Sequence, residues 1–336
     1  MRLVFLGTPA FAVPSLEKLA ASGRSVLLVV TQPDRPVGRG LREAPPPVKE
    51  AALRLGIPVA QPERVRRPAA VEQLRELSPD VMVVVGYGQI IPQSVIDIPP
   101  LGIVNVHSSL LPKYRGAAPV QWAIANGETR TGVTTMRIDA GLDTGDILLV
   151  RETEIGPEET AVELSGRLAD MGADLLVETL DGLEAGRIVP RKQDSAQATH
   201  APLLKKEDGL VDWREPAESI HNRIRAMQPW PGAYTTFRGQ TLHIWQARVI
   251  SPEPLSDVRG SERSADPRTE PGPGGAPSES GGPGSLLRLK PLTLACGRGA
   301  LELREVQLEG RRRMSAADFV NGHRLTERDI LGEART

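Results

Sequence analysis

Residues 81–85 read VMVVV, an unbroken apolar run in which four of the five residues are β-branched. A short run of this kind is typical of a strand that is buried on both faces, as in a parallel sheet. Similar runs occupy residues 3–6, 26–30 and 103–106. We therefore expect these four segments to be central strands of one sheet.

Amphipathic stretches with helical spacing, such as residues 14–21 and 69–77, alternate with these runs. Alternation of strands and helices predicts an α/β fold with an open, doubly wound sheet. Residues 131–138 and 147–154 indicate a later antiparallel addition. Residues 158–183 predict a long helix, opened by a proline and two glutamates.

The pattern changes near residue 190. Residues 190–208 are polar and aperiodic, which is typical of a linker, so we place a first domain at 1–189 and a second at 209–336. Short alternating runs in the second domain indicate a small β-barrel or sandwich. These runs are residues 234–237, 242–245, 286–289 and 301–306.

Residues 251–285 interrupt the second domain. The stretch contains 7 Pro, 7 Gly and 7 Ser and no aromatic residue. Such a segment cannot bury enough apolar surface to offset the entropy lost on folding. We expect a disordered insert in the β domain.

The bulk composition excludes several classes of protein. A formal net charge of -1 over 336 residues gives no overall attraction to nucleic acid, although local basic surfaces remain available. The single cysteine, Cys296, excludes an internal disulfide framework, and we expect an ordinary buried thiol. No apolar run approaches the roughly 20 residues that span a bilayer, and the N-terminal run is too short for a signal peptide. We expect a cytoplasmic monomer without membrane association.

Two polar residues stand where the 103–106 strand ends. Asn105 and His107 are two positions apart, so their side chains leave the strand on the same face. Ligands of open α/β sheets bind outside the carboxyl ends of the strands. Either residue alone more often satisfies backbone groups. Together, an amide and an imidazole on one face can address one oxygen, which favours a functional site.

Residues 139–146, DAGLDTGD, join the two segments of the antiparallel addition and carry three carboxylates and two glycines. An acidic turn or a divalent metal loop is the simplest interpretation. EF-hand spacing fails, because no acidic residue occupies the twelfth position counted from Asp139. The glycines permit close approach of the backbone to a ligand.

Two further loops follow predicted strands. The loop at residues 6–11 has one glycine followed by Thr-Pro rather than GxGxxG, which disfavours a dinucleotide. The loop at residues 31–42 holds three arginines. They are either solvated or available to bind phosphates.

Seven motifs together resemble the folate-dependent formyltransferase family. They are Gly7-Thr-Pro, Thr31-Gln-Pro-Asp-Arg-Pro-Val-Gly-Arg-Gly, Val83-Val-Val-Gly-Tyr-Gly, Asn105-Val-His-Ser-Ser-Leu-Leu-Pro-Lys-Tyr-Arg-Gly-Ala-Ala-Pro, Gly141-Leu-Asp-Thr-Gly-Asp, Gln228-Pro-Trp-Pro and Arg313-Met-Ser-Ala-Ala-Asp-Phe-Val-Asn-Gly-His. The resemblance covers nearly the whole chain except residues 251–285, where the insert is longer than the usual loop of the family. Asn-x-His with the later Asp-x-Gly implies formyl transfer without fixing the acceptor. The arginine loop and the Met-Ser-Ala-Ala-Asp-Phe motif imply a tRNA acceptor.

The resemblance implies a Rossmann-like catalytic domain followed by an OB-like barrel. It implies transfer of a formyl group from the co-substrate 10-formyltetrahydrofolate to the free amino group of initiator methionyl-tRNA, for translation initiation, without a metal. By position it assigns the catalytic roles to Asn105, His107 and Asp143. It assigns folate contacts to Ser109, Leu110, Leu111, Pro112, Tyr87 and Gly88, and tRNA contacts to Arg39, Arg42 and Lys206.

Two alternatives remain open at this point. The acceptor could instead be a small amine, such as a glycinamide nucleotide or an amino sugar, although such an acceptor does not need a large accessory domain. The chain could also be a non-catalytic RNA-binding protein with an inactive α/β domain. The intact set of Asn105, His107 and Asp143 argues against that second alternative.

Overall fold

The computed structural model describes residues 1–37, 42–250 and 282–332, and the chain divides into two compact units, residues 1–204 and 205–336. Each unit has its own sheet and its own hydrophobic core. The division falls inside residues 190–208, the segment that the sequence predicts to be a linker.

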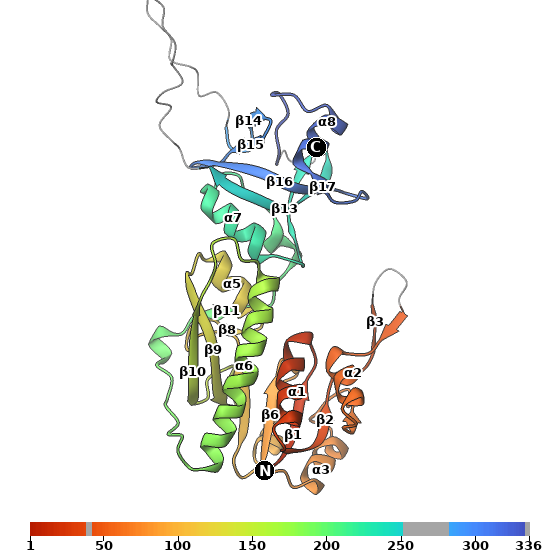
Figure 1. Ribbon diagram of the computed structural model, residues 1–336, viewed down its shortest axis with the longest axis vertical. Coiled ribbons are helices and arrows are strands. Elements are labelled where there is room, and N and C mark those ends of the chain that lie inside the picture. Colours follow the sequence, from red (N-terminus) through yellow and green to blue (C-terminus); the bar gives the residue numbers. More distant parts are fainter. Residues whose placement is uncertain (38–41, 251–281, 333–336) are drawn as a thin grey trace, which may run out of the picture. The chain divides into compact units, whose positions relative to one another are not determined.

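The first unit is built on a seven-stranded sheet with the order β10-β9-β7-β6-β1-β2-β5 (Figure 1). Five neighbouring strands run parallel, and β9 and β10 are added antiparallel at one edge. The predicted parallel sheet and its antiparallel addition are confirmed. The strands are β1 Arg2–Gly7, β2 Ser25–Val30, β5 Val59–Ala60, β6 Val81–Val85, β7 Ile103–His107, β9 Arg130–Arg137 and β10 Ile147–Glu154.

Helices pack on both faces of this sheet. On one face, Val4 and Met82 share a core with Val71 and Leu74 of α3. On the other, α6 contacts β7 and β9, and a methyl group at Gly172 would lie 2.8 Å from Val106 Cγ1, so this helix lies close to the sheet. The helices are α1 Val13–Ala21, α2 Pro47–Arg54, α3 Pro68–Glu76, α4 Gln93–Ile96, α5 Pro119–Ala125 and α6 Ala161–Glu184.

The long helix α6 begins three residues later than the sequence predicts. Thr160 is its N-cap, and the Glu163 N–H donates to Thr160 Oγ1 at 3.3 Å. The Glu163 carboxylate in turn accepts from the Thr160 N–H at 2.9 Å. This reciprocal capping box satisfies two N–H groups that would otherwise lack partners, and it fixes the start of the helix.

A short hairpin follows β2. Its strands are β3 Arg35–Val37 and β4 Arg42–Ala44, and the sequence predicts only a loop here. At its base, Lys49 and Gln61 each donate to the Asp34 carboxylate at 2.6 Å. These bonds, with that from Lys49 the larger cause, lower the pKa of Asp34. Arg39 lies outside the described residues, and of Arg42 only the backbone is described.

The second unit contains an antiparallel sheet with the order β12-β13-β16-β15-β14, and β17 pairs with β16. The antiparallel character of this half is as predicted. Its core includes Trp213, Ile220 and Phe319. The elements are β12 Ala233–Phe237, β13 Gln240–Ile250, β14 Leu286–Leu289, β15 Leu292–Ala295, β16 Ala300–Leu308, β17 Met314–Ser315, α7 Ala217–Ala226 and α8 Ala316–His323.

The predicted disordered insert mostly lies outside the described residues, but its last residues do not. Gly284 N–H donates to the Ala295 carbonyl at 2.9 Å, and Ser285 forms a bridge with Ile330. Gly284 has φ +85, and an added methyl group there would collide with the Leu331 carbonyl. The close packing of two chain segments therefore requires a glycine at position 284. The prediction of disorder is wrong for residues 282–285.

Residues 191–201 pair through their backbone with other segments of the first unit. Arg191 exchanges two backbone hydrogen bonds with Ile147, at 2.8 and 2.9 Å. The short strand β11, His200–Ala201, pairs in parallel with β8, Arg115–Gly116, which follows β7 along the chain. The polar, aperiodic sequence of this segment gave no sign of these contacts.

In the described part of the chain, no helix is both long enough and apolar enough to cross a membrane.

Candidate active site

The carboxyl end of β7 carries Asn105 and His107. Asn105 pairs in register with Val84 of β6 and Met136 of β9, and His107 pairs with Thr134 of β9. The side chain of His107 is 6% exposed, whereas Asn105 is partly exposed. β7 therefore lies between β6 and β9. Its last side chains stand at the carboxyl end of the strand, where ligands of such folds bind.

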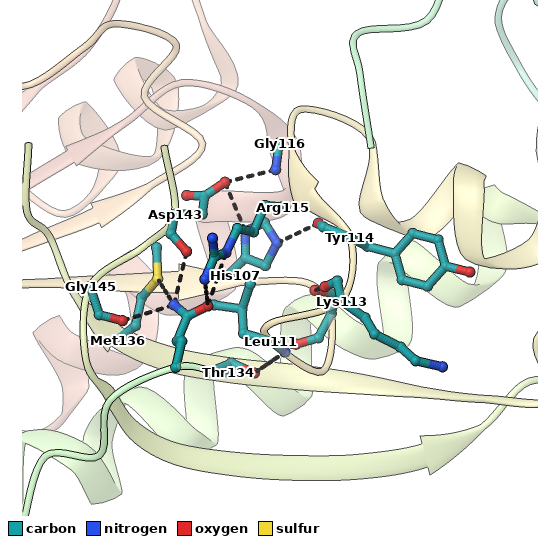
Figure 2. Close-up of polar contacts among 12 residues, drawn as sticks. His107, Leu111, Lys113, Tyr114, Arg115, Gly116, Thr134, Met136, Asp143 and Gly145 are labelled. Carbon is teal, nitrogen blue, oxygen red and sulfur yellow. Dashed lines mark hydrogen bonds and ion pairs between the residues drawn. The ribbon is translucent and has the colours of Figure 1, made fainter. Parts of the chain in front are cut away.

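The imidazole of His107 lies between a carbonyl and a carboxylate (Figure 2). Its Nε2 is 2.9 Å from the Tyr114 carbonyl oxygen, and its Nδ1 is 3.8 Å from Asp143 Oδ2. A carbonyl oxygen can only accept, so Nε2 carries a proton. The ring can then take up a second proton only on Nδ1, the atom that faces the carboxylate.

Asp143 is held in a strained loop. Its φ is +53, in the left-handed region that aspartate tolerates better than most residues. Its Oδ2 accepts a hydrogen bond from the Gly116 N–H at 2.8 Å. Asp139, another carboxylate of the same loop, accepts instead from the Gly141 N–H and from Thr144 Oγ1. Of these two carboxylates, Asp143 is the one that approaches His107.

The carboxamide of Asn105 is the free group of the set. Among the residues that the structure describes, it forms no hydrogen bond. Its two N–H donors are therefore available to an oxygen of a substrate. The arrangement combines an uncommitted amide donor with an imidazole that has a carboxylate behind it.

The turn after β7 is held by its own hydrogen bonds. The hydroxyl of Ser109, which is 0% exposed, donates to the Lys113 carbonyl at 2.6 Å, and Thr134 Oγ1 donates to the Ser109 carbonyl at 2.7 Å. Leu111 is buried against Met136. Leu110 and Pro112 are partly exposed. Of the four residues assigned to folate in this turn, these last two present the more accessible side chains.

Tyr87 and Gly88 follow β6, the strand next to β7. Tyr87 is 1% exposed, and its carbonyl accepts from Thr8 Oγ1 at 3.0 Å and Gln32 Nε2 at 3.1 Å. Burial raises the pKa of Tyr87 to about 12, and its hydroxyl has no partner among the described residues. Gly88 is exposed with φ +82. Gln32 therefore lies beside this turn, although the sequence analysis assigns it no role of its own.

Sequence reasoning missed the residues that hold the loops of the site together. Arg115 is 6% exposed, and its guanidinium donates to Gln193 Oε1 through Nε and Nη2, at 3.0 and 2.8 Å. Gln193 Nε2 donates to the carbonyls of Asp143 and Gly145, both at 2.8 Å. Arg115 lies in a recognised motif. Gln193 lies in the predicted linker, where no pattern singled it out.

The second unit presents three aromatic rings along β12 and β13, together with an arginine that immediately precedes β17. The rings of Tyr234 and His243 are 5.9 Å apart, and His243 stacks on Trp245 at 5.9 Å. The guanidinium of Arg313 lies 3.5 Å from the centre of the Trp245 ring. Burial, and then the charge of Lys206, lower the pKa of His243. We refer to Tyr234, His243, Trp245 and Arg313 as the aromatic row.

The predicted site residues thus fall into separate groups. Asn105, His107 and Asp143 lie around the end of β7, and Lys206 is exposed in the second unit. Within the described ranges, no group of three or more His, Cys, Asp or Glu side chains is arranged to hold a metal ion.

Comparisons with known proteins all indicate the same family. Residues 1–180 match the formyl transferase family, and residues 203–324 match the C-terminal domain of formyl transferases. The chain is 63% identical over 333 residues to methionyl-tRNA formyltransferase of Solibacter usitatus, covering 99% of both chains. It is 53% identical over 336 residues to the enzyme of the same name from Koribacter versatilis, again covering 99% of both.

A solved structure shares the fold. The N-formyltransferase of Helicobacter canadensis, crystallised with folinic acid and dTDP-3-aminofucose, matches with a TM-score of 0.63 and 17% identity. The match covers 93% of this chain and 99% of that one.

Proposed function

The chain belongs to the formyl transferase family, and we propose that it transfers the formyl group of 10-formyltetrahydrofolate to the free amino group of methionyl-tRNA. The product, N-formylmethionyl-tRNA, serves translation initiation. The observation that carries the proposal is the 63% identity to a methionyl-tRNA formyltransferase over 99% of both chains, because it includes both units. The sugar-related neighbour is 17% identical and supports the fold alone.

Asn105 is proposed to stabilise the negative charge that develops on the formyl oxygen. Attack of an amine on a formyl group gives a tetrahedral centre with an oxyanion, and a positioned amide donor lowers its energy by about 3–4 kcal/mol. The Asn105 carboxamide has no competing hydrogen bond among the described residues, so it can bind this oxygen without first breaking a contact.

His107 is proposed to move the proton that the reaction must transfer. The amine nitrogen that attacks loses a proton, and the folate nitrogen that leaves must gain one. With Nε2–H donating to the Tyr114 carbonyl, the transferable proton sits on Nδ1. Asp143 Oδ2 lies 3.8 Å from this Nδ1. We therefore assign Asp143 the role of orienting the imidazole.

No nucleophile from the chain is required. A free α-amino group has a reference pKa of about 7.7–8.0, so a useful fraction is uncharged near neutral pH. The acceptor itself therefore attacks the formyl carbon, and the protein supplies orientation, charge stabilisation and proton transfer. The buried thiol of Cys296 lies in the other unit and has no part in this scheme.

The side chains around the site are compatible with a folate. Gly88 leaves open space beside its Cα, since only Gln32 Nε2, at 3.8 Å, lies within van der Waals distance of a methyl group added there. We propose that Gly88, Leu110 and Pro112 line the folate site. Tyr87, Ser109 and Leu111 are buried, and they contribute by shaping the two turns from within.

The tRNA is proposed to contact both units. Arg39 and Arg42 lie in the sequence segment 31–42, and arginines bind phosphates through paired N–H groups. In the second unit, the aromatic row offers rings on which bases can stack, with Arg313 and Lys206 as neighbouring cations. One chain carries all these parts, so a monomer suffices, and a tRNA acceptor places the reaction in the cytoplasm.

Radiolabelled formyl transfer to four acceptors, measured in parallel, tests this function. The acceptors are methionyl-tRNA, a glycinamide nucleotide, an amino-sugar nucleotide and water. We expect label in methionyl-tRNA at a rate far above that of the other three. A small amine that is formylated with an equal or higher kcat/KM would establish the small-acceptor alternative. Tight tRNA binding without transfer to any acceptor would establish the non-catalytic one.

Arg39→Ala tests the proposed tRNA contacts. We expect the KM for methionyl-tRNA to rise about tenfold, with little change in the KM for the folate, and we expect a shallower dependence of tRNA binding on salt. Hydrolysis of the formyl-folate in the absence of tRNA serves as the control. An equal loss in that control reaction would contradict a role in tRNA binding.

A further inference from the structure

Gln193 uses its whole hydrogen-bonding capacity inside the active-site region. Its Oε1 accepts twice from Arg115, and its two N–H groups donate to the carbonyls of Asp143 and Gly145. A guanidinium can only donate and a carbonyl can only accept, so the orientation of the amide is fixed. No other natural side chain of this size has both sets of groups.

The contacts of Gln193 bear on the position of Asp143. The loop around Asp143 has a left-handed residue, and Gly145 has no room for a side chain because the Arg137 carbonyl lies against it. Gln193 holds this loop by two backbone carbonyls, while Gly116 N–H holds the Asp143 carboxylate. Asp143, whose carboxylate faces His107, is therefore held both by its backbone carbonyl and by its side chain. The Arg115 and Asp143 groups involved are drawn in Figure 2.

Arg115 depends on Gln193 in return. Its guanidinium is buried, and among the described residues it forms no ion pair. A buried cation without a hydrogen-bonded partner is costly. Arg115 is the residue between Tyr114, whose carbonyl accepts from His107, and Gly116, whose N–H holds Asp143. The amide of Gln193 thus joins the two loops that orient the imidazole.

The surrounding segment holds the same two loops through its backbone. Arg191 pairs with Ile147, just beyond the Asp143 loop. On the other side, the Tyr114 N–H donates to Thr199 Oγ1, and the Arg115 N–H donates to the Thr199 carbonyl, both at 2.8 Å. Residues 191–201 lie between the two stretches that match the family domains, residues 1–180 and 203–324.

We propose that Gln193 is a positioning residue for formyl transfer, which ties the Asp143 loop to Arg115 and keeps the Asp143 carboxylate beside the His107 imidazole. This inference rests on the proposed function. It assigns a catalytic consequence to a segment whose sequence is typical of a linker.

Gln193→Glu separates positioning from folding. Glutamate keeps the acceptor for Arg115 and adds a counter-charge, but it loses both N–H donors to the Asp143 and Gly145 carbonyls. We expect kcat for methionyl-tRNA to fall about tenfold, with the KM values of both substrates within about twofold and the Tm nearly unchanged. Gln197→Glu is the matched control, because Gln197 is exposed and its side chain hydrogen-bonds, among the described residues, only to Asp194. It should behave as the wild type.

Two further measurements identify the route of the effect. In an Asp143→Asn background, Gln193→Glu should lower kcat by less than about twofold, since the group that it positions is already lost. Hydrogen exchange followed by mass spectrometry should show faster exchange in the peptide that contains Gly116, whose N–H binds Asp143. This second readout does not need catalysis.

The outcomes are distinguishable. A wild-type enzyme that formylates no methionyl-tRNA refutes the proposed function, while the exchange at Gly116 still decides the positioning inference. A wild-type enzyme that is active, with a Gln193→Glu variant of equal kcat and unchanged exchange, overturns the inference. A tenfold loss that persists in full in the Asp143→Asn background also overturns it.

Discussion

Two stretches meet in the first unit, residues 103–118 and residues 190–202, and they differ in what they contribute. The first supplies Asn105 and His107, which carry the proposed chemistry. The second supplies Gln193, Thr199 and the short strand β11, which hold the loops of the site. Reacting groups and the groups that position them therefore come from stretches of very different sequence character.

From this difference we expect a graded series of effects, in which the loss of a reacting side chain from residues 103–118 lowers kcat most and the loss of a contact made by residues 190–202 lowers it less. His107→Ala should have the largest effect and lower kcat at least about a hundredfold, because it removes the proton donor. His200→Ala is its matched control in the other stretch, since His200 is exposed and pairs with Arg115 through its backbone. Steady-state kinetics should show a lower kcat for His107→Ala alone. Equal losses of kcat in both variants would contradict the distinction between the two stretches.

Gly116→Ala should force the two stretches apart. Gly116 has φ +124, and a methyl group there would lie 2.5 Å from the Ala201 carbonyl oxygen. Backbone strain of this kind costs on the order of 1–3 kcal/mol, and the displaced Gly116 N–H no longer holds Asp143. We expect a lower Tm together with a kcat reduced about tenfold.

Gly166→Ala is the control for that glycine. It lies on the exposed side of α6, with nothing within 4 Å of the added methyl group. Alanine in a helix is more stable than glycine by about 0.5–1 kcal/mol, so the Tm should rise slightly. A Gly116→Ala variant with the Tm and kcat of the wild type would show that β8 and β11 are not closely joined.

Thr199→Val should have a smaller effect. It removes the oxygen that accepts from the Tyr114 N–H while keeping the shape of the side chain. Loss of one such partner costs about 1–3 kcal/mol, and we expect a value near the lower limit because Thr199 is exposed. Urea unfolding should show this loss, with kcat reduced by no more than about threefold. Thr199→Ser keeps the acceptor and should match the wild type; equal losses in both variants would exclude the hydrogen bond as the cause.

Trp122→Phe should have the smallest effect. The indole N–H of Trp122 donates to the Pro202 carbonyl at 2.8 Å, at the far end of residues 190–202. Phenylalanine removes this single bond, worth about 0.5–1.5 kcal/mol. We expect a slight drop in Tm and an unchanged kcat. A large loss of activity would mean that this contact, and not Gln193, determines the position of the segment.

Local patterns in the sequence predicted much of the fold. The run at 81–85 is β6, and the two-residue spacing of Asn105 and His107 placed both side chains on one face of β7. Such features depend on a strand's own residues, so they are visible without the structure. The pattern also predicts the helix α6, but the helix begins three residues later, because the capping box between Thr160 and Glu163 sets its start.

Other features depend on contacts between distant residues. Gln193 interacts with Arg115, 78 residues away, and with Asp143, 50 residues away. Nothing in the local sequence of a polar segment reports such partners. The burial of the Ser109 hydroxyl and the packing requirement at Gly284 also depend on contacts that the local sequence does not indicate. Asp143 was assigned by resemblance, and the structure places its carboxylate near His107.

A double-mutant cycle of formyl transfer to methionyl-tRNA, made with Asn105→Ala and His107→Ala, tests the central claim most directly. If both side chains act on one tetrahedral centre, each single variant loses at least about a hundredfold in kcat. The double variant then loses far less than the product of the two, since residues that act as a unit are not additive. Turnover of either single variant within about twofold of the wild type would contradict the account.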